Sequence, residues 1–325
     1  MAYDIITVGS ATRDVFFVSK QFKIIESKQF ETGKAGCIAL GSKINVDEMV
    51  LSTGGGGTNS AATFASLGFN TATITRIGID DPGKAVLADL KRFGVKTSLV
   101  NEVKKGQTGY SALLTTTTGE RSILTHRGVS AEFGPKDIPW SNLKSKWIYM
   151  TSLAGNLSLA LGIAKTAKQN GARVAFNPGS LEIKQGIRKL EPIMKYLTVL
   201  NLNLEEAQAL ARSKSRDIGK IAKTIAKPGL TLIITDGSNG SYAYLDGTLW
   251  FARPRNIKAL SRTGAGDAFG SGLIAALAKG MGIDEALQIG TLNAESVIQS
   301  HGAKNGILSS WPKPALMKKI KVRTV

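Results

Sequence analysis

The chain has 325 residues, 42% of them hydrophobic, enough for one large α/β domain with a substantial core. Its single cysteine, Cys37, excludes an internal disulfide, and with no signal sequence in evidence it predicts a reducing, cytoplasmic location. No apolar run approaches the roughly 18 residues of a membrane span, so we expect no membrane partner.

The formal charge of +18, from 42 Lys and Arg against 24 Asp and Glu, raises the hypothesis of nucleic-acid binding. The basic residues are scattered, however, apart from a denser patch over 313–323. No zinc-finger spacing or aromatic RNA-binding motif accompanies them. We therefore favour a solvated basic surface over a nucleic-acid site.

Residues 3–9 form an apolar run that ends in glycine, which is typical of a buried parallel strand. Asp14 follows at the carboxyl end of this strand, where open α/β sheets bind ligands, although a turn residue is the alternative. Residues 15–52 do not show the alternation of strand and helix patterns that is typical of an α/β domain. Their alternating segments predict exposed antiparallel strands outside the main core.

Four glycines, Gly54 to Gly57, precede Asn59 and a helix of small residues. They allow backbone to approach a ligand closely, whereas a flexible turn is the simpler alternative. Residues 71–78 predict a strand, and Asp80 with Pro82 predicts the start of a helix. Residues 108–128 contain two alternating segments separated at 118–121, which is the pattern of a hairpin.

From residue 146 onward strands and helices alternate regularly, with strands at 147–151, 173–176, 199–202 and 231–235. This order predicts a parallel, doubly wound sheet. Asn203 and Glu206 have the spacing of a capping box at the start of a helix. The turn from Asp236 to Gly240 is tight enough to direct backbone N–H groups toward a nucleotide.

The most informative stretch runs from Arg262 to Gly270 and precedes a helix that we expect to end at Gly280. Gly264 and Gly266 at a helix N-terminus leave backbone N–H groups free to bind an anion. Asp267 would repel a resting anion, so it has either a general-base role or a dipole role in the first helical turn. The general-base interpretation predicts a phosphotransferase. A further helix is expected from Asp284 to near Ser300.

Two common nucleotide-binding motifs are absent. No Gly-x-x-x-x-Gly-Lys-Ser/Thr loop occurs, which excludes a Walker-type phosphate site. The first strand-to-helix turn lacks Gly-x-Gly-x-x-Gly, which makes a dehydrogenase a poor second class.

Nearly end to end, the chain resembles the ribokinase-like (PfkB) family of carbohydrate and nucleoside kinases. Gly54-Gly55 with Asn59 is similar to the N-terminal signature of the family, and Thr263 to Asp267 to its C-terminal one. Five shorter motifs lie in the expected order: Gly78 to Gly83, Gly119 to Arg121, Asn203 to Glu206, Thr235 to Gly237, and His301 to Ala303.

The resemblance implies one three-layer α/β/α, Rossmann-like domain over 1–325, with a small β-sheet lid from about 15–52 and 108–128. It also implies an ATP- and Mg²⁺-dependent kinase that phosphorylates a sugar hydroxyl, and it supplies roles for the residues. Asp267 would be the base, and the backbone of Gly264, Ala265, Gly266 and Asp267 the anion hole. Asn203 and Glu206 would hold Mg²⁺ and the phosphates through water. Thr235, Gly237, Gly240 and Asn293 would contact the nucleotide, and Asp14, Gly55 and Asn59 the acceptor.

Ser261 stands where many members of the family have the aspartate of a monovalent-cation site, so potassium activation is not carried over to this chain. Arg262 either supplies charge near the phosphates or makes a surface salt bridge. A nucleoside kinase is the main alternative, and a nucleic-acid-binding protein on a kinase scaffold is the competing class. We also expect a homodimer formed through the lid.

Overall fold

The computed structural model describes residues 3–30, 33–117 and 120–325. Their central feature is a nine-stranded sheet with the order β17-β16-β15-β14-β13-β12-β11-β1-β6. The strands from β6 to β14 are parallel, and β14 to β17 pair antiparallel at one edge. The bounds are β1 (Tyr3–Val8), β6 (Thr71–Ile74), β11 (Ser145–Met150), β12 (Arg173–Phe176), β13 (Val199–Asn203), β14 (Thr231–Thr235), β15 (Ser241–Leu245), β16 (Thr248–Arg253) and β17 (Lys321–Thr324).

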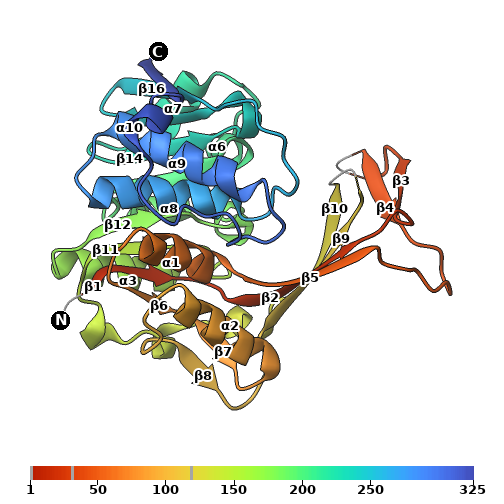
Figure 1. Cartoon of the computed structure of the whole chain (residues 1–325). Helices are drawn as coiled ribbons and strands as arrows, with labels where there is room; N and C mark the ends of the chain where they lie inside the picture. Colours follow the sequence, from red (N-terminus) through yellow and green to blue (C-terminus); the bar gives the residue numbers. More distant parts are fainter. Residues whose placement is uncertain (1–2, 31–32, 118–119) are drawn as a thin grey trace.

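Helices cover both faces of this sheet, because alternate side chains of its strands point to opposite sides. Ile6 and Ile148 pack on one face under α3, α5, α6 and α7, and Ile5 and Trp147 pack on the other under α1, α8 and α9. Figure 1 shows α1, α8 and α9 together on the near face, with α3 behind the sheet. The chain is thus a three-layer α/β/α fold, and the predicted fold class is confirmed.

The described α-helices are α1 (Gly56–Ser66), α2 (Asp81–Arg92), α3 (Leu157–Gln169), α4 (Ser180–Ile183), α5 (Ile187–Met194), α6 (Leu204–Ala211), α7 (Ile218–Ile225), α8 (Ala265–Ala278), α9 (Ile283–Val297) and α10 (Pro314–Met317). Short 3₁₀ turns lie at η1 (Gly128–Glu132), η2 (Pro135–Asp137), η3 (Trp140–Asn142) and η4 (Gly237–Asn239). Asp80 caps α2, since its carboxylate accepts a hydrogen bond from the backbone of Gly83, as the sequence predicts. The predicted helix from Asp284 to Ser300 is α9, which ends earlier, at Val297.

A smaller sheet projects from the α/β body to one side (Figure 1). Its order is β10-β9-β2-β5, from β10 (Arg121–His126), β9 (Gly109–Thr115), β2 (Thr12–Val18) and β5 (Glu48–Gly54). A hairpin of β3 (Lys23–Glu26) and β4 (Lys34–Cys37) extends it, and β7 (Arg76–Gly78) pairs with β8 (Asn101–Val103) nearer the body. We call β2, β3, β4, β5, β9 and β10 the lid.

The lid strands come from the segments where the sequence predicts antiparallel strands and a hairpin. β9 and β10 pair antiparallel from Tyr110 with His126 to Thr115 with Arg121. Gly119, part of a motif named above, lies outside the described residues. β5 ends at Gly54, just before α1, and Gly54 pairs there with Thr12 at the start of β2. The lid therefore meets the body at the glycine run Gly54 to Gly57.

Candidate active site

The N-terminus of α8 has the geometry on which the predicted anion cradle depends. Gly264 is the N-cap with φ of +82°, and a side chain there would collide with the backbone of Ala303. The backbone N–H groups of Gly266 and Asp267 have no hydrogen-bond partner among the described residues. They lie at the positive end of a 14-residue helix, which favours an anion at this point.

Asp267 lies in the first turn of α8, and its carboxylate Oδ2 accepts a hydrogen bond of 2.7 Å from Nδ2 of Asn59. Asn59 belongs to α1, so this contact joins two segments that are 208 residues apart. Burial raises the pKa of Asp267, whereas the Asn59 hydrogen bond and the charge of Lys304 act in the opposite direction. The result is an oriented carboxylate beside free backbone donors, which is the arrangement that a general base for phosphoryl transfer requires.

Asp14 is a buried carboxylate on the lid strand β2. Oγ1 of Thr12 donates to its Oδ1 over 2.8 Å, and burial raises the pKa of Asp14. A Cβ on Gly54 would lie 1.9 Å from Oδ2 of Asp14, so only glycine leaves room for this carboxylate. Gly55 has φ of +95°, and a Cβ there would meet the carbonyl oxygen of Ser10 at 2.4 Å. The glycine run therefore shapes the pocket wall around Asp14, a role that a merely flexible turn does not have.

Lys304, which the sequence analysis does not single out, is the buried cation of this cluster. Its Nζ donates to the carbonyl oxygen of Thr53 over 2.9 Å and forms an ion pair of 3.2 Å with Asp89 of α2. Burial lowers the pKa of Lys304, and the charges of Asp89, Asp14 and Asp267 oppose that change. The only sequence signal is its place directly after the His301-Gly302-Ala303 motif, because its partners lie in distant segments.

The predicted nucleotide side lies at the ends of β13 and β14. Asn203 and Glu206 form the expected capping box: the backbone of Glu206 donates to Oδ1 of Asn203 over 2.8 Å, and the backbone of Asn203 donates to Oε2 of Glu206 over 2.9 Å. Thr235 is the strand neighbour of Asn203. Burial is the main cause that raises the pKa of Glu206, and the negative charge of Glu205 raises it further. The hydrogen bond from the backbone of Asn203 lowers this pKa and only partly offsets the increase.

The two glycines of the turn after β14, Gly237 and Gly240, have different surroundings. A side chain on Gly237 would meet nothing within 4 Å, so its backbone is open to a ligand. A side chain on Gly240 would collide with Phe251 and with the carbonyl oxygen of Ala252. Gly240 is therefore needed for packing against β16, whatever else it contacts.

Two residues lie differently from their expected roles. Asn293 is fully buried; its Nδ2 donates to the carbonyl oxygen of Ala268 over 2.7 Å, and its Oδ1 accepts from the backbone of Leu308 over 2.8 Å. Its amide thus ties α9 to α8, which argues against contact with adenine. Arg262 is exposed and makes no salt bridge with any described residue. The surface salt bridge, one of the two roles considered for Arg262, is therefore wrong. The positive charge of Arg262 acts on Arg121 of the lid strand β10. The pKa of Arg121 is lowered mainly by burial and secondly by this charge.

The donor set fits a metal ion held mainly by water and phosphate oxygens. Among residues 3–30, 33–117 and 120–325, no cluster of three or more His, Cys, Asp or Glu side chains could hold a metal by itself. Glu206 is a partly buried carboxylate beside Asn203, and Mg²⁺ commonly keeps several waters next to one or two such groups. The described helices include none with the length and apolar character of a membrane span.

A doubly wound sheet with an oriented carboxylate and unpaired helix N–H groups at the carboxyl ends of its strands has the geometry of a phosphotransferase with an alcohol acceptor. Comparison with known proteins gives the family: a model of the pfkB family carbohydrate kinases matches residues 4–310. The chain belongs to this family of carbohydrate kinases and is a sugar kinase of the ribokinase type. Family membership also implies ATP as the phosphoryl donor.

Two curated relatives and one solved structure illustrate the similarity. An uncharacterized sugar kinase from Archaeoglobus fulgidus is 29% identical over 74% of this chain and 96% of its own length. An ATP-dependent ribose-1-phosphate kinase from Halopiger xanaduensis is 29% identical over 73% of this chain and 77% of its own. The nucleoside kinase of Methanocaldococcus jannaschii shares the fold with a TM-score of 0.76 and 21% identity, over 98% of this chain and 99% of its own.

Proposed function

We propose that this kinase transfers the γ-phosphoryl group of Mg²⁺-bound ATP to a sugar hydroxyl, with Asp267 as the general base. The observation that carries the proposal is the Asn59–Asp267 hydrogen bond at the mouth of α8. It orients a carboxylate next to backbone N–H groups that have no other described partner. A carboxylate and unpaired backbone N–H groups within one helical turn support the assignment of a proton acceptor beside an anion site.

The chemistry follows from that placement. Asp267 accepts the proton of the acceptor hydroxyl as the hydroxyl oxygen forms a bond to the γ-phosphorus. The bond from that phosphorus to the bridging oxygen of ADP breaks, and ADP leaves with the electron pair. The unpaired N–H groups of Gly266 and Asp267 stabilise the charge on the transferring group, whereas the N–H group of Ala265 donates to the carbonyl oxygen of Arg262 over 3.4 Å. Asp14, Gly55 and Asn59 hold the acceptor.

On the nucleotide side, Thr235 and Gly237 line the phosphates, and Gly240 fixes the turn that presents them. Asn203 and Glu206 would hold Mg²⁺ through water. The metal ion, when bound, supplies positive charge that neutralises the β- and γ-phosphate oxygens. We do not include Asn293 in this site, because its amide is occupied in the core.

A sugar is preferred over a nucleoside as acceptor. A nucleoside needs an apolar face on which its base can stack. Among the described residues that line the cavity beside Asp14, only Phe133 is aromatic, and it is 6% exposed. The two curated relatives are named for a sugar and a sugar phosphate, and the solved structure for a nucleoside, so all three acceptor classes belong in any test.

The test is ADP release in a coupled assay with Mg²⁺-ATP and a panel of sugars, sugar phosphates and nucleosides. We expect turnover with a sugar or a sugar phosphate and none without Mg²⁺. The same preparation is assayed for binding to duplex and single-stranded nucleic acid at physiological salt, where we expect none. Nucleic-acid binding without ADP release from any acceptor would replace this proposal with the competing class.

The lid also supports a proposal about assembly. Strand register puts Asp14, Ser111 and Thr125 on one face of the lid and Met49, Leu51 and Leu124 on the other. The second set is 58%, 52% and 61% exposed, respectively. We propose that a second copy of the chain covers this outer face.

Cytoplasmic location stays a prediction from the free thiol of Cys37.

A further inference from the structure

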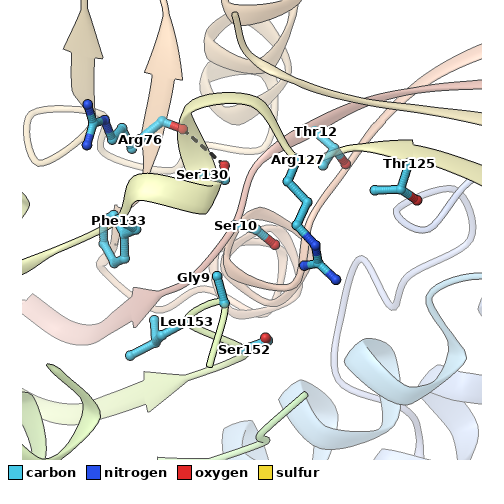
Figure 2. Close-up of a pocket in the computed structure, with 11 residues that line it drawn as sticks. Gly9, Ser10, Thr12, Arg76, Thr125, Arg127, Ser130, Phe133, Ser152 and Leu153 are labelled. Atoms are coloured by element: carbon cyan, nitrogen blue, oxygen red, sulfur yellow. Dashed lines mark hydrogen bonds between the residues drawn. The ribbon is translucent and has the colours of Figure 1, made fainter. Parts of the chain in front are cut away.

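A small cavity adjoins the candidate acceptor site, and one basic side chain points into it. The cavity has a volume of about 130 Å³ and lies at the carboxyl ends of β1 and β11, below the end of the lid strand β10. Figure 2 shows the guanidinium group of Arg127 directed into this space, with Ser10 and Ser152 facing it. The second arginine of the lining, Arg76, points away.

The two arginines differ in how their charge is balanced. Arg76 is buried and pairs with Asp137 at 3.4 Å and with Glu132 at 3.2 Å. Arg127 is exposed and makes neither a hydrogen bond nor an ion pair through its side chain with any described residue. No Asp or Glu is among the described residues that line the cavity. Arg127 is therefore a cation available to a ligand.

The neighbours of Arg127 are donors that suit an oxyanion. Among the hydroxyl groups that line the cavity, those of Ser10 and Thr125 donate to no described residue. Two others are already committed, since Thr12 donates to Asp14 over 2.8 Å and Ser152 donates to Glu182 over 3.0 Å. A guanidinium with hydroxyl groups around it matches the several acceptor oxygens of a phosphate group. At about 30 Å³ per water molecule, the cavity holds roughly four waters, which is enough room for one phosphate.

The position of the cavity assigns this phosphate to the acceptor. Its lining comes from the loops after β1 and β11, from the lid, and from β7 and η1. The predicted nucleotide residues instead lie at the end of β13 and at or after the end of β14. β12 lies between the two groups in the sheet. Thr12 belongs to the cavity and also donates to Asp14, the proposed acceptor ligand. The cavity is thus continuous with the acceptor site and separate from the ATP site.

We propose that the acceptor is a sugar that already carries a phosphate group, and that Arg127 binds this phosphate. The inference rests on the proposed kinase function and specifies its substrate class. A free hydroxyl of the sugar phosphate forms the new bond to the γ-phosphorus of ATP, its proton passes to Asp267, and ADP leaves. The product is a sugar bisphosphate.

The experiment compares wild type with Arg127→Gln on matched acceptor pairs: ribose with ribose 1-phosphate and ribose 5-phosphate, fructose with its 1- and 6-phosphates, and gluconate as a sugar acid. We expect wild type to prefer a phosphorylated acceptor. Arg127→Gln should lower kcat/KM for that acceptor by roughly 10- to 100-fold, mainly through KM, because a charge-assisted hydrogen bond is lost. Neutral sugars and the KM for ATP should stay unchanged.

Lys23→Gln is the matched control, since Lys23 is an exposed cation on the lid hairpin and lines no part of the cavity. Inorganic phosphate provides a readout independent of turnover. It should inhibit competitively against the acceptor, and it should raise the melting temperature of wild type and of Lys23→Gln more than that of Arg127→Gln.

The outcomes separate the inference from the kinase function. A wild-type preference for neutral sugars or for gluconate overturns the inference and leaves the kinase standing. The inference is also overturned if Arg127→Gln lowers kcat/KM equally for phosphorylated and neutral acceptors. It is overturned as well if the only change in Arg127→Gln is a higher KM for ATP. Absence of ADP release with every acceptor counts against the kinase proposal instead. In that case the melting temperatures still test the phosphate site. The site is overturned if phosphate and ribose 5-phosphate raise the melting temperatures of wild type and of Arg127→Gln equally.

Discussion

Asp267 combines two features that pull its pKa in opposite directions. Burial favours the protonated acid, whereas the Asn59 hydrogen bond and the charge of Lys304 favour the carboxylate. The balance leaves its pKa above the ordinary aspartate value of 3.8. A raised pKa makes Asp267 a stronger base toward a sugar hydroxyl.

Replacing Asp267 with asparagine tests this role directly. Asp267→Asn keeps the size of the side chain but removes the proton acceptor, so kcat should fall by roughly 10²- to 10⁴-fold. ATP affinity should stay the same or rise, because a negative charge leaves the phosphate site. Turnover and nucleotide affinity are measured side by side.

Asp284→Asn is the control for that experiment. Asp284 is also an aspartate in the first turn of a helix, but it is exposed at the start of α9 and contacts no proposed site residue. It should leave turnover unchanged. Near-normal turnover in Asp267→Asn would mean that the base lies elsewhere.

Lys304 offers a second prediction, on pH dependence. Its charge lowers the pKa of both Asp267 and Asp14, so Lys304→Met should raise both pKa values further. The base must be deprotonated to act, and the acidic limb of the kcat/KM profile should therefore move to higher pH than in wild type. A profile with an unmoved acidic limb would show that Lys304 has no electrostatic influence on the base.

Stability should change in the same variant, because Lys304→Met removes the buried cation that pairs with Asp89 and hydrogen-bonds to Thr53. Asp89 keeps its ion pair of 2.7 Å with Arg92, so we expect a loss smaller than the roughly 3–5 kcal/mol of unfolding free energy that an unpaired buried charge typically costs. The double variant Lys304→Met/Asp89→Asn removes both charges and should recover part of this loss, as measured by chemical denaturation. A double variant no more stable than the single one would point to the lost hydrogen bonds to Thr53 instead.

At the scale of the elements, the glycine run between β5 and α1 couples the lid to the acceptor site. Gly54 ends β5, and its missing side chain is what lets Asp14 of β2 lie against it. Gly54→Ala should therefore displace the Asp14 carboxylate and raise the KM for the acceptor, with a smaller effect on the KM for ATP.

Gly36→Ala is the matched variant for that test. Gly36 is a lid glycine in β4 whose added Cβ would meet nothing closer than 3.4 Å, from Oγ of Ser122. It should leave both KM values unchanged. Equal changes in the two variants would indicate a general effect on the lid rather than on Asp14.

The sequence predicts the elements better than it predicts the contacts between them. The parallel strands after residue 146, the capping box of Asn203 and the helix start at Gly264 follow from local residue patterns, and the structure contains each of them. Lys304 could not be found in this way, because its partner Thr53 is 251 residues away along the chain. The burial of Asn293 depends likewise on how α9 packs against α8, which no local pattern specifies.

For the whole molecule, the lid has two unlike faces. The inner face carries Asp14 and contacts the loop after α9, where the rings of Phe16 and His301 lie 5.8 Å apart. The outer face presents Met49, Leu51 and Leu124 to solvent. A contiguous apolar face on a small projecting sheet is typical of a protein–protein contact.

We expect a homodimer in which two lids pack through their outer faces. The double variant Met49→Lys/Leu51→Lys places two charges on that face and should shift the protein toward monomer, measured by light scattering across a concentration series. Both residues are more than half exposed in the single chain, so the fold itself should be little affected. The double variant Ile24→Lys/Ile25→Lys on β3 is the control, because it adds the same charge elsewhere on the lid. A wild-type protein that is monomeric throughout the series would contradict the dimer and leave the assignment of the base untouched.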